Sequence, residues 1–100
     1  MKYNKLVRDK IPENIKKKGE RVISHIATEK EYWQKLKEKL SEEIEEFKKN
    51  ESIEEFADFL EVADAIAEYK KFSKEDIESI RKAKAREKGL YKKRVILDES

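Results

Sequence analysis

The segment LSEEIEEFKKNESIEEFADFLE, residues 40–61, decides the fold of this chain. It contains nine acidic residues among 22, interleaved with Leu, Ile and Phe. Apolar residues recur at helical spacing on both sides of Asn50, and Ser52 with Glu55 three residues later is a capping box, which begins a helix. The segment therefore predicts the end of one helix, a tight break, and the start of a second helix.

Both helices extend well beyond this segment. The upstream helix is expected to begin at a second capping box, Thr28 with Glu31, and to run to the break at Asn50. The downstream helix is expected to run from Ser52 to about Lys71. The apolar stripe of the upstream helix consists of Trp33, Leu36, Leu40, Ile44 and Phe47.

Shorter elements are predicted at both ends of the chain. Residues 9–19 predict a short helix, with Pro12 in its first turn and Gly19 just past its end. Ser73 begins another helix that Gly89 closes. Residues 22–27 and 93–98 are strand-like and could form a minor two-stranded pairing. We therefore expect a mainly α single domain, 1–100, a helical bundle of two long antiparallel helices plus shorter ones.

The composition narrows the class of protein. Charged residues make up 48% of the chain and hydrophobic residues 37%, which is little for the core of a 100-residue domain, so we expect a homodimer or homotetramer. The net charge of +2 comes from interleaved signs, which does not favour nucleic acid. There is no Cys, no apolar leader and no apolar run of membrane length, so a soluble, cytoplasmic protein without a membrane partner is expected.

The acidic residues of the upstream helix are not equivalent in position. At about 100° per residue, Glu43 lies roughly 60° from Leu40, on the shoulder of the apolar stripe. Glu46 lies further along the same side, whereas Glu42 and Glu45 point to solvent. Glu43 is therefore expected to be partly buried, with Glu46 beside it.

The downstream helix is apolar nearly all round, which predicts burial on two sides. One face carries Ile53, Phe56, Leu60, Ala63 and Ala67, and another carries Val62, Ala65 and Tyr69. Glu55 and Asp58 share the second face. In an antiparallel hairpin about residues 50–51, facing residues have numbers that sum to about 101, which places Glu46 level with Glu55 and Glu43 level with Asp58.

Four partly buried carboxylates at one height predict a metal site. They cannot all stay ionised without a counter-charge, because like charges in a dry site raise one another's pKa. Carboxylate oxygens are the ligands that Mg²⁺ or Mn²⁺ prefers. The proposed ligands are Glu43, Glu46, Glu55 and Asp58.

Two alternatives stay open. The first is an ordinary charged surface, in which Lys39, Lys48 and Lys49 neutralise the acids and Glu55 only caps its helix. The second is a different ligand pair, because Glu61 and Asp64 follow in register and would join or replace Glu55 and Asp58.

The same acids carry a resemblance to a known family. EEIEE (42–46) followed by EEFAD (54–58) resembles the E-E-x-x-E … E-x-x-D motif of the all-α NTP pyrophosphatases, the MazG-like and phosphoribosyl-ATP pyrophosphohydrolase-like superfamily. YNKLVRDKIPE (3–13) and KAREKGLYKK (84–93) are similar to a small single-domain branch of it. The gap between the acidic motifs is shorter here than is usual in that family.

The resemblance implies a Mg²⁺-dependent enzyme that hydrolyses a nucleoside triphosphate to the monophosphate and pyrophosphate, in clearing the nucleotide pool. It implies that Glu43, Glu46, Glu55 and Asp58 hold the metal, and that a carboxylate, either Glu46 or Glu61, activates the attacking water. The triphosphate also needs cations, for which the candidates are Lys5, Arg8, Lys84 and Arg86. The alternative is a non-enzymatic helical module that binds a partner through its apolar downstream helix.

Overall fold

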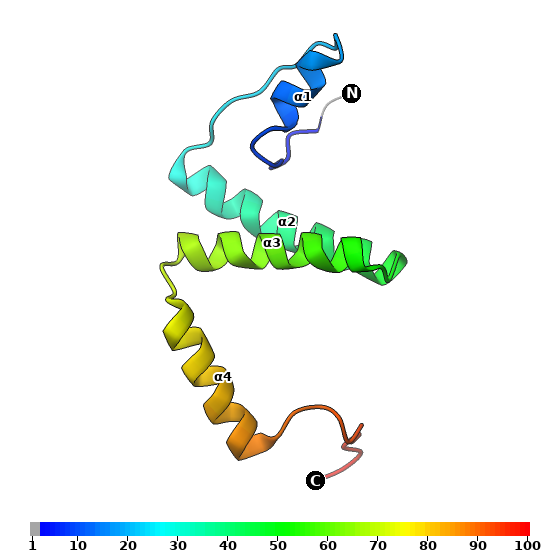
Figure 1. The fold of residues 1–100 in the computed structure, drawn as a ribbon, viewed down its shortest axis with the longest axis vertical. Helices are drawn as coiled ribbons and strands as arrows, with labels where there is room; N and C mark the ends of the chain where they lie inside the picture. Colours follow the sequence, from blue (N-terminus) through cyan, green and yellow to red (C-terminus); the bar gives the residue numbers. More distant parts are fainter. Residues whose placement is uncertain (1–2) are drawn as a thin grey trace.

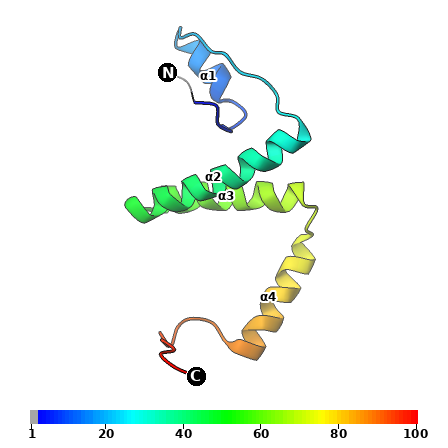
Figure 2. The same ribbon diagram turned by 180° about the vertical axis from the view of Figure 1, so that it is seen from behind.

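The computed structural model describes residues 3–100, so residues 1 and 2 of the expected 1–100 domain lie outside it. The helices of the described chain are α1 (Ile11–Lys17), α2 (Glu29–Lys49), α3 (Ile53–Tyr69) and α4 (Lys74–Lys88). The two long helices, α2 and α3, lie against each other as an antiparallel hairpin, and α1 and α4 project to opposite sides of it (Figures 1 and 2). The expected mainly α architecture is confirmed.

Local side-chain chemistry explains where the three longer helices begin. Before each one a hydroxyl accepts a hydrogen bond from the backbone N–H three residues later, which satisfies one otherwise unpaired donor of the first turn. The three bonds are Glu31 N to Thr28 Oγ1 at 3.3 Å, Glu55 N to Ser52 Oγ at 3.2 Å, and Asp76 N to Ser73 Oγ at 3.0 Å. All three predicted capping positions are confirmed.

Helix ends follow the predicted pattern with one small difference. Gly19 and Gly89 stand after α1 and α4 with φ of +81° and +82°, a conformation in which a residue with a Cβ is strained. Helix α3 ends at Tyr69, before the expected Lys71. Lys71 itself has a φ of +61°, so the backbone has already left the helical region there.

The apolar core lies between α2 and α3. Leu36 of α2 is 1% exposed and Val62 of α3 is 9% exposed, and they are the two buried hydrophobic side chains of residues 3–100. At one end of the hairpin the rings of Trp33 and Tyr69 stack, with centroids 5.1 Å apart. At the other end Phe47 meets Phe56 edge to face at 5.8 Å. The hairpin is therefore held along its whole length.

The rest of the chain is open. Its radius of gyration is 18.0 Å, whereas a compact domain of 100 residues has about 13 Å. Helix α4 does not pack against the hairpin, and it leads away from α3 toward a C-terminal segment on the far side of an open space (Figure 1). A single chain thus completes one helical hairpin and leaves much apolar surface uncovered.

The described residues 3–100 contain no strand. Residues 22–27, between α1 and α2, and residues 93–98, after α4, are irregular and lie at opposite ends of the molecule (Figure 2). Their pairing within a minor sheet stays a prediction. No helix of the described part of the chain is long and apolar enough to cross a membrane.

Candidate functional site

Three of the predicted acidic residues meet where α2 and α3 face each other. One carboxylate oxygen each of Glu43, Glu55 and Asp58 lies within 4.8 Å of the other two. Glu43 comes from α2 and is 8% exposed, while Glu55 and Asp58 come from α3 and are half-buried. The spacing of i and i+3 puts the two α3 residues on one side, and the hairpin brings Glu43 to the same height. We call these three residues the acidic cluster.

Glu46, the fourth expected ligand, lies at the margin of this cluster. It is exposed, and its carboxylate is not among the three that converge. Its charge nevertheless acts on Glu55, since Glu46 is one of the groups that shift the Glu55 pKa. The structure therefore brings together three of the four predicted ligands and keeps the fourth within electrostatic reach.

The cluster is electrostatically strained at Glu55. Desolvation raises the pKa of the Glu55 carboxyl above its ordinary value, and the negative charges of Asp58, Glu46 and Glu43 raise it further. A positive charge placed among these carboxylates would reverse that effect. The site thus has the electrostatic character of one that gains from a bound cation.

Two basic side chains already contact the cluster. Lys39 Nζ lies 3.4 Å from Glu43 Oε1, one turn away on α2. Arg8 reaches from the N-terminal segment and donates a hydrogen bond to Asp58 Oδ1 at 2.8 Å. Of the predicted phosphate-binding residues, Arg8 is the one that the structure brings directly onto the acidic cluster.

Lys5 lies beside the cluster and contacts a different acid. Its Nζ is 3.2 Å from Glu42 Oε1, and Lys39 reaches the same oxygen at 3.3 Å. Desolvation by itself would raise the Glu42 pKa, but the two lysines outweigh it and hold that pKa below its ordinary value. The prediction that Glu42 points to open solvent was wrong, because the N-terminal segment covers that side of α2.

The other predicted site residues lie apart from the cluster. Glu61 and Asp64 are exposed on α3 and do not join the three converging carboxylates. Lys84 and Arg86 are exposed on α4, which does not pack against the hairpin within this chain. Their roles as general base, alternative ligands and phosphate-binding residues stay predictions.

The donor set of the cluster fits a hard divalent cation. All three groups offer carboxylate oxygen, which suits Mg²⁺ or Mn²⁺. With metal–oxygen distances near 2.1 Å, ligand oxygens on opposite sides of the ion are about 4.2 Å apart. Only one pair of three ligands can be opposite in octahedral geometry, and neighbouring ligand oxygens are about 3.0 Å apart. Side-chain rotation would therefore need to bring oxygens at the 4.8 Å limit closer by about 0.6 to 1.8 Å.

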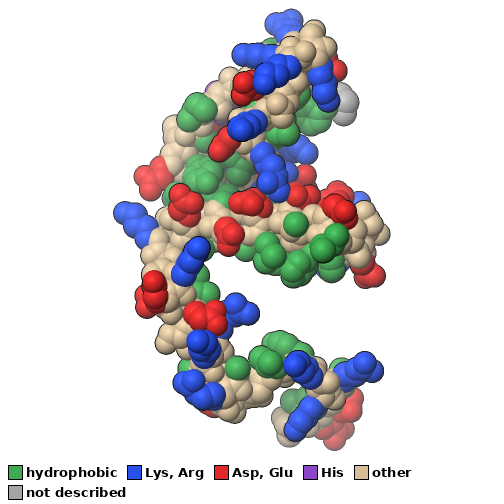
Figure 3. All heavy atoms as spheres, viewed as in Figure 1, with side chains coloured by type: hydrophobic (Ala, Val, Ile, Leu, Met, Phe, Trp, Pro, Cys, Tyr) green, Lys and Arg blue, Asp and Glu red, His purple; other side chains and the backbone are tan. Residues whose placement is uncertain are grey.

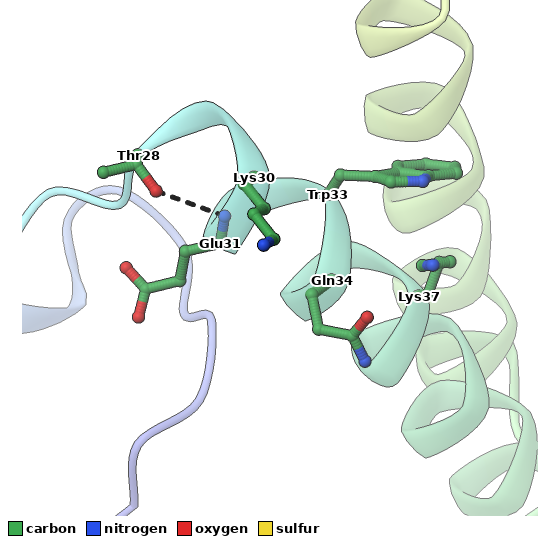
Figure 4. A pocket seen from close by; sticks show the side chains of 6 residues that line it. All are labelled: Thr28, Lys30, Glu31, Trp33, Gln34 and Lys37. Carbon is green, nitrogen blue, oxygen red and sulfur yellow. Dashed lines mark hydrogen bonds between the residues drawn. The ribbon is translucent and has the colours of Figure 1, made fainter.

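A separate hollow lies elsewhere, at the beginning of α2. Its volume is about 520 Å³, and Figure 4 shows Trp33 extending from its wall toward α3. Lys37 and Lys70 approach the Trp33 ring at 5.3 and 5.2 Å from its centroid. Trp33 is ten residues from Glu43, about 15 Å along the helix, so this hollow is separate from the acidic cluster. The lining residues are Thr28, Lys30, Glu31, Trp33, Gln34 and Lys37.

The sequence did not predict where two basic side chains, Arg8 and Lys5, would lie. Nothing in helical spacing indicates that Arg8 would reach Asp58, 50 residues later in the chain, or that Lys5 would reach Glu42. The sequence did show basic residues in its opening segment, which made both residues candidates. It did not indicate which acids they would contact. Comparison with protein-family models, curated proteins and solved structures finds no match for this chain.

Proposed function

We propose that this protein is a Mg²⁺-dependent nucleoside triphosphate pyrophosphohydrolase that clears the cytoplasmic nucleotide pool. The observation that carries the proposal is the convergence of Glu43, Glu55 and Asp58 from two helices. These residues were selected by helical phase and hairpin register, and they also occupy the acidic motifs that resemble the all-α NTP pyrophosphatases. Two independent lines of reasoning therefore point to the same carboxylates.

The electrostatics favour a site with a role over a plain charged surface. On a solvated helix, acids commonly pair with lysines three or four residues away, as Glu43 does here with Lys39. Glu55, by contrast, is a half-buried carboxylate whose pKa is raised by desolvation and, in addition, by its acidic neighbours, which is a cost to the folded chain. Groups whose pKa is shifted by burial and specific neighbours concentrate at functional sites.

The proposal assigns roles to the residues around the cluster. Bound Mg²⁺ would neutralise charge on the phosphate oxygens and lower the pKa of a bound water. Glu43, Glu55 and Asp58 would hold it, with Glu46 as a fourth ligand. Arg8, which already contacts Asp58, would turn its guanidinium fork to a phosphate, and Lys5 would supply a second charge beside it.

The remaining roles depend on a second chain or on movement. Glu46 lies near enough to the cluster to accept a proton from the attacking water, and Glu61 is the alternative base. Lys84 and Arg86 lie on α4, away from their own cluster. In the homodimer or homotetramer that we propose, α4 of another copy would bring them to the phosphates.

The test is hydrolysis by the purified full chain. We would incubate it with Mg²⁺ and a panel of standard and modified nucleoside triphosphates, and measure pyrophosphate release. We expect release with at least one substrate, and its loss in Glu43→Gln and Asp58→Asn, with helical content unchanged by circular dichroism. The matched control is Glu38→Gln, which removes an acid from α2 outside the cluster. A folded, Mg²⁺-loaded protein that releases no pyrophosphate from any of them contradicts the proposal.

A second candidate function is a non-enzymatic helical module, and the uncovered apolar surface of α3 favours it. Such a module needs no metal. Its melting temperature would not change with Mg²⁺ or Mn²⁺, whereas the enzyme would be stabilised by ligand linkage. Thermal melts with and without Mn²⁺ therefore separate the two candidates.

A further inference from the structure

Three lysine side chains lie around the indole of Trp33, at the end of the hairpin where α2 begins and α3 ends. Lys37 Nζ and Lys70 Nζ lie 5.3 and 5.2 Å from the ring centroid, and Lys30 lines the hollow beside the ring. The ring is held by Tyr69, on which it stacks with the two planes 6° apart. Figure 4 shows the indole extending from α2 with Lys37 close beside it. We call Trp33 and the three lysines the indole site.

The three lysines of the indole site have no acidic partner within the described chain. None of them has an Asp or Glu three or four residues away in the sequence, which is the spacing at which ion pairs form on a helix. None of them forms an ion pair within residues 3–100. By contrast, Lys35 and Lys39 on the same helix pair with Glu38 and Glu42. The positive charge around Trp33 therefore has no neutralising contact from residues 3–100.

Acidic side chains at the hollow are held by other contacts. Of the residues that line it, Glu31 is the one acid, and His25 Nε2 lies 2.9 and 3.1 Å from its two carboxylate oxygens. Figure 4 shows this carboxylate directed away from the indole, and Figure 3 shows basic side chains spread over this end of the molecule. Glu38 accepts hydrogen bonds from Gln34 and Lys35. The hollow thus combines an aromatic wall with lysines that can bind an anion.

The size and chemistry of the hollow indicate the class of ligand. Its volume of about 520 Å³ falls within the range of about 300–1,000 Å³ that small-molecule sites occupy, so a bare anion would leave most of it empty. Lysine ammonium groups bind phosphate, and a tryptophan ring stacks on planar bases of any kind. A cationic ligand is disfavoured by the lysines, although an indole alone would attract one. A planar ring that carries a phosphate uses both features of the hollow.

The indole site points away from the acidic cluster. Lys37 and Glu43 are six residues apart on α2, which separates them by about 9 Å along the helix axis and about 120° around it. A phosphate bound by Lys37 therefore lies apart from the carboxylates of the cluster. Its binding needs no metal ion and does not depend on hydrolysis at the cluster.

We propose that the indole site binds a mononucleotide without a metal ion, with the base against Trp33 and the phosphate between Lys37 and Lys70. Rotation of the two lysine side chains, which approach the same ring, brings both ammonium groups to one phosphate. Lys30 adds a third positive charge at the rim. Because Lys37 belongs to α2 and Lys70 directly follows α3, the phosphate joins the two helices at the end opposite their connection.

The fluorescence of Trp33 tests the proposal directly, because it is the one Trp of the chain. We would titrate the purified full chain with AMP in the presence of a chelator. We expect a saturable change in emission, with a dissociation constant on the order of 0.1 mM. Adenosine lacks the phosphate and ribose 5-phosphate lacks the base, so each should bind at least about tenfold more weakly than AMP. Titration calorimetry provides a signal that is independent of fluorescence.

Variants that remove one charge locate the site. Lys37→Gln and Lys70→Gln should each raise the dissociation constant for AMP about fivefold to tenfold, with helical content retained because both lysines are exposed. Lys48→Gln is the matched control, since it removes a lysine at the far end of α2 that pairs with Glu45, and it should leave the dissociation constant unchanged. The chelator keeps metal out of the acidic cluster, so this test and the test of hydrolysis can fail separately.

Three results contradict the proposal. The first is the absence of saturable AMP binding up to about 10 mM by both methods. The second is an unchanged dissociation constant in a folded double variant, Lys37→Gln with Lys70→Gln. The third is adenosine or ribose 5-phosphate that binds as tightly as AMP, which would mean that the hollow does not use both the base and the phosphate.

Discussion

The two apolar faces of α3 have similar residues and different surroundings. The inner face, around Val62, packs on α2 and holds Glu55 and Asp58 beside the buried Glu43. The outer face is largely exposed within the described chain, apart from the edge-to-face contact of Phe56 with Phe47. It consists of Ile53, Phe56, Leu60, Ala63 and Ala67. One face is completed by local hairpin formation, because α2 and α3 are joined by only a few residues. The other face stays largely exposed in the described chain.

The candidate metal site and the exposed apolar surface therefore lie on different faces of one helix. The inner face is closed enough to lower the solvation of carboxylates, which is what raises the Glu55 pKa. The outer face has no titratable group at its centre and is suited to packing alone. Substitutions on the two faces should therefore have different effects, and the following predictions test that difference.

The largest expected effect on stability comes from a substitution on the inner side of the hairpin. Leu36→Ala should lower the free energy of unfolding by about 3–5 kcal/mol, because Leu36 is 1% exposed and its removal leaves a cavity. Leu60→Ala removes the same atoms from the outer face, and at low protein concentration it should cost under about 1 kcal/mol. Urea unfolding followed by circular dichroism measures both.

Protein concentration then sharpens the comparison. The cost of Leu60→Ala should grow as the wild-type chain becomes dimeric, whereas the cost of Leu36→Ala should change little. If both variants lower the free energy of unfolding by the same amount at every protein concentration, the two faces do not differ in this way.

The next effect is stabilisation by a metal ion at the inner face. Mn²⁺ at a hundred times its dissociation constant should add about 2.7 kcal/mol to the free energy of unfolding. Glu43→Gln should abolish this gain, since it removes the buried ligand of the cluster. Asp64→Asn, an exposed acid on the same hairpin, should retain it. Thermal melts with Mn²⁺ and with a chelator provide the measurement, and loss of the gain in Asp64→Asn alone would move the site to Glu61 and Asp64.

A smaller effect is expected from Arg8. Its guanidinium occupies an oxygen of Asp58 that a metal ion would use, so Arg8→Ala should tighten Mn²⁺ binding. An exposed ion pair contributes up to about 1 kcal/mol, which corresponds to a gain of roughly 2- to 5-fold. Lys5→Ala removes the same charge from the same segment but pairs with Glu42, outside the cluster, and should change the affinity less. Titration calorimetry with Mn²⁺ compares the two, and equal changes would indicate a general charge effect.

The smallest effect is the pH dependence of Glu55. Because its folded-state pKa is raised above the ordinary value of 4.5, folding favours the protonated carboxyl. The stability of the wild-type chain should therefore fall as pH rises from about 4.5 through the raised folded pKa, and the loss should persist above it. Glu55→Gln lacks this loss and keeps the capping backbone bond.

The variant should melt slightly above wild type at neutral pH and at the same temperature below pH 4.5, in melts without metal. A gap that instead widens on acidification would mean that Glu55 is stabilised as a carboxylate. Glu68→Gln, at an exposed position of the same helix away from Glu55, serves as the control.

Much of the fold could be predicted because its signals are local. The hydroxyls of Thr28, Ser52 and Ser73 act within one helical turn, so each helix start depends only on residues next to it. The acidic cluster could be predicted for a related reason: Glu55 and Asp58 share a face by spacing, and a short break leaves the antiparallel register of Glu43 little freedom.

Other features depend on contacts between distant parts of the chain. The N-terminal segment lies along α2 and sends Arg8 to Asp58, and no periodicity in the sequence encodes that path. The same segment covers Glu42, which helical phase alone had placed toward solvent. Glu46 stands outside the cluster because side-chain positions at its margin depend on the exact packing of the hairpin, which residue spacing does not specify.

The sequence by itself determined the helices, the hairpin and the set of carboxylates that the hairpin brings together, because capping, helical phase and a short connection act over few residues. It also determined that α3 has two apolar faces. Only the tertiary structure decided which of them the chain buries, which cations reach the acids, and that α4 leads away from the hairpin. Those outcomes depend on side chains that meet across tens of residues, where many arrangements compete and packing selects among them.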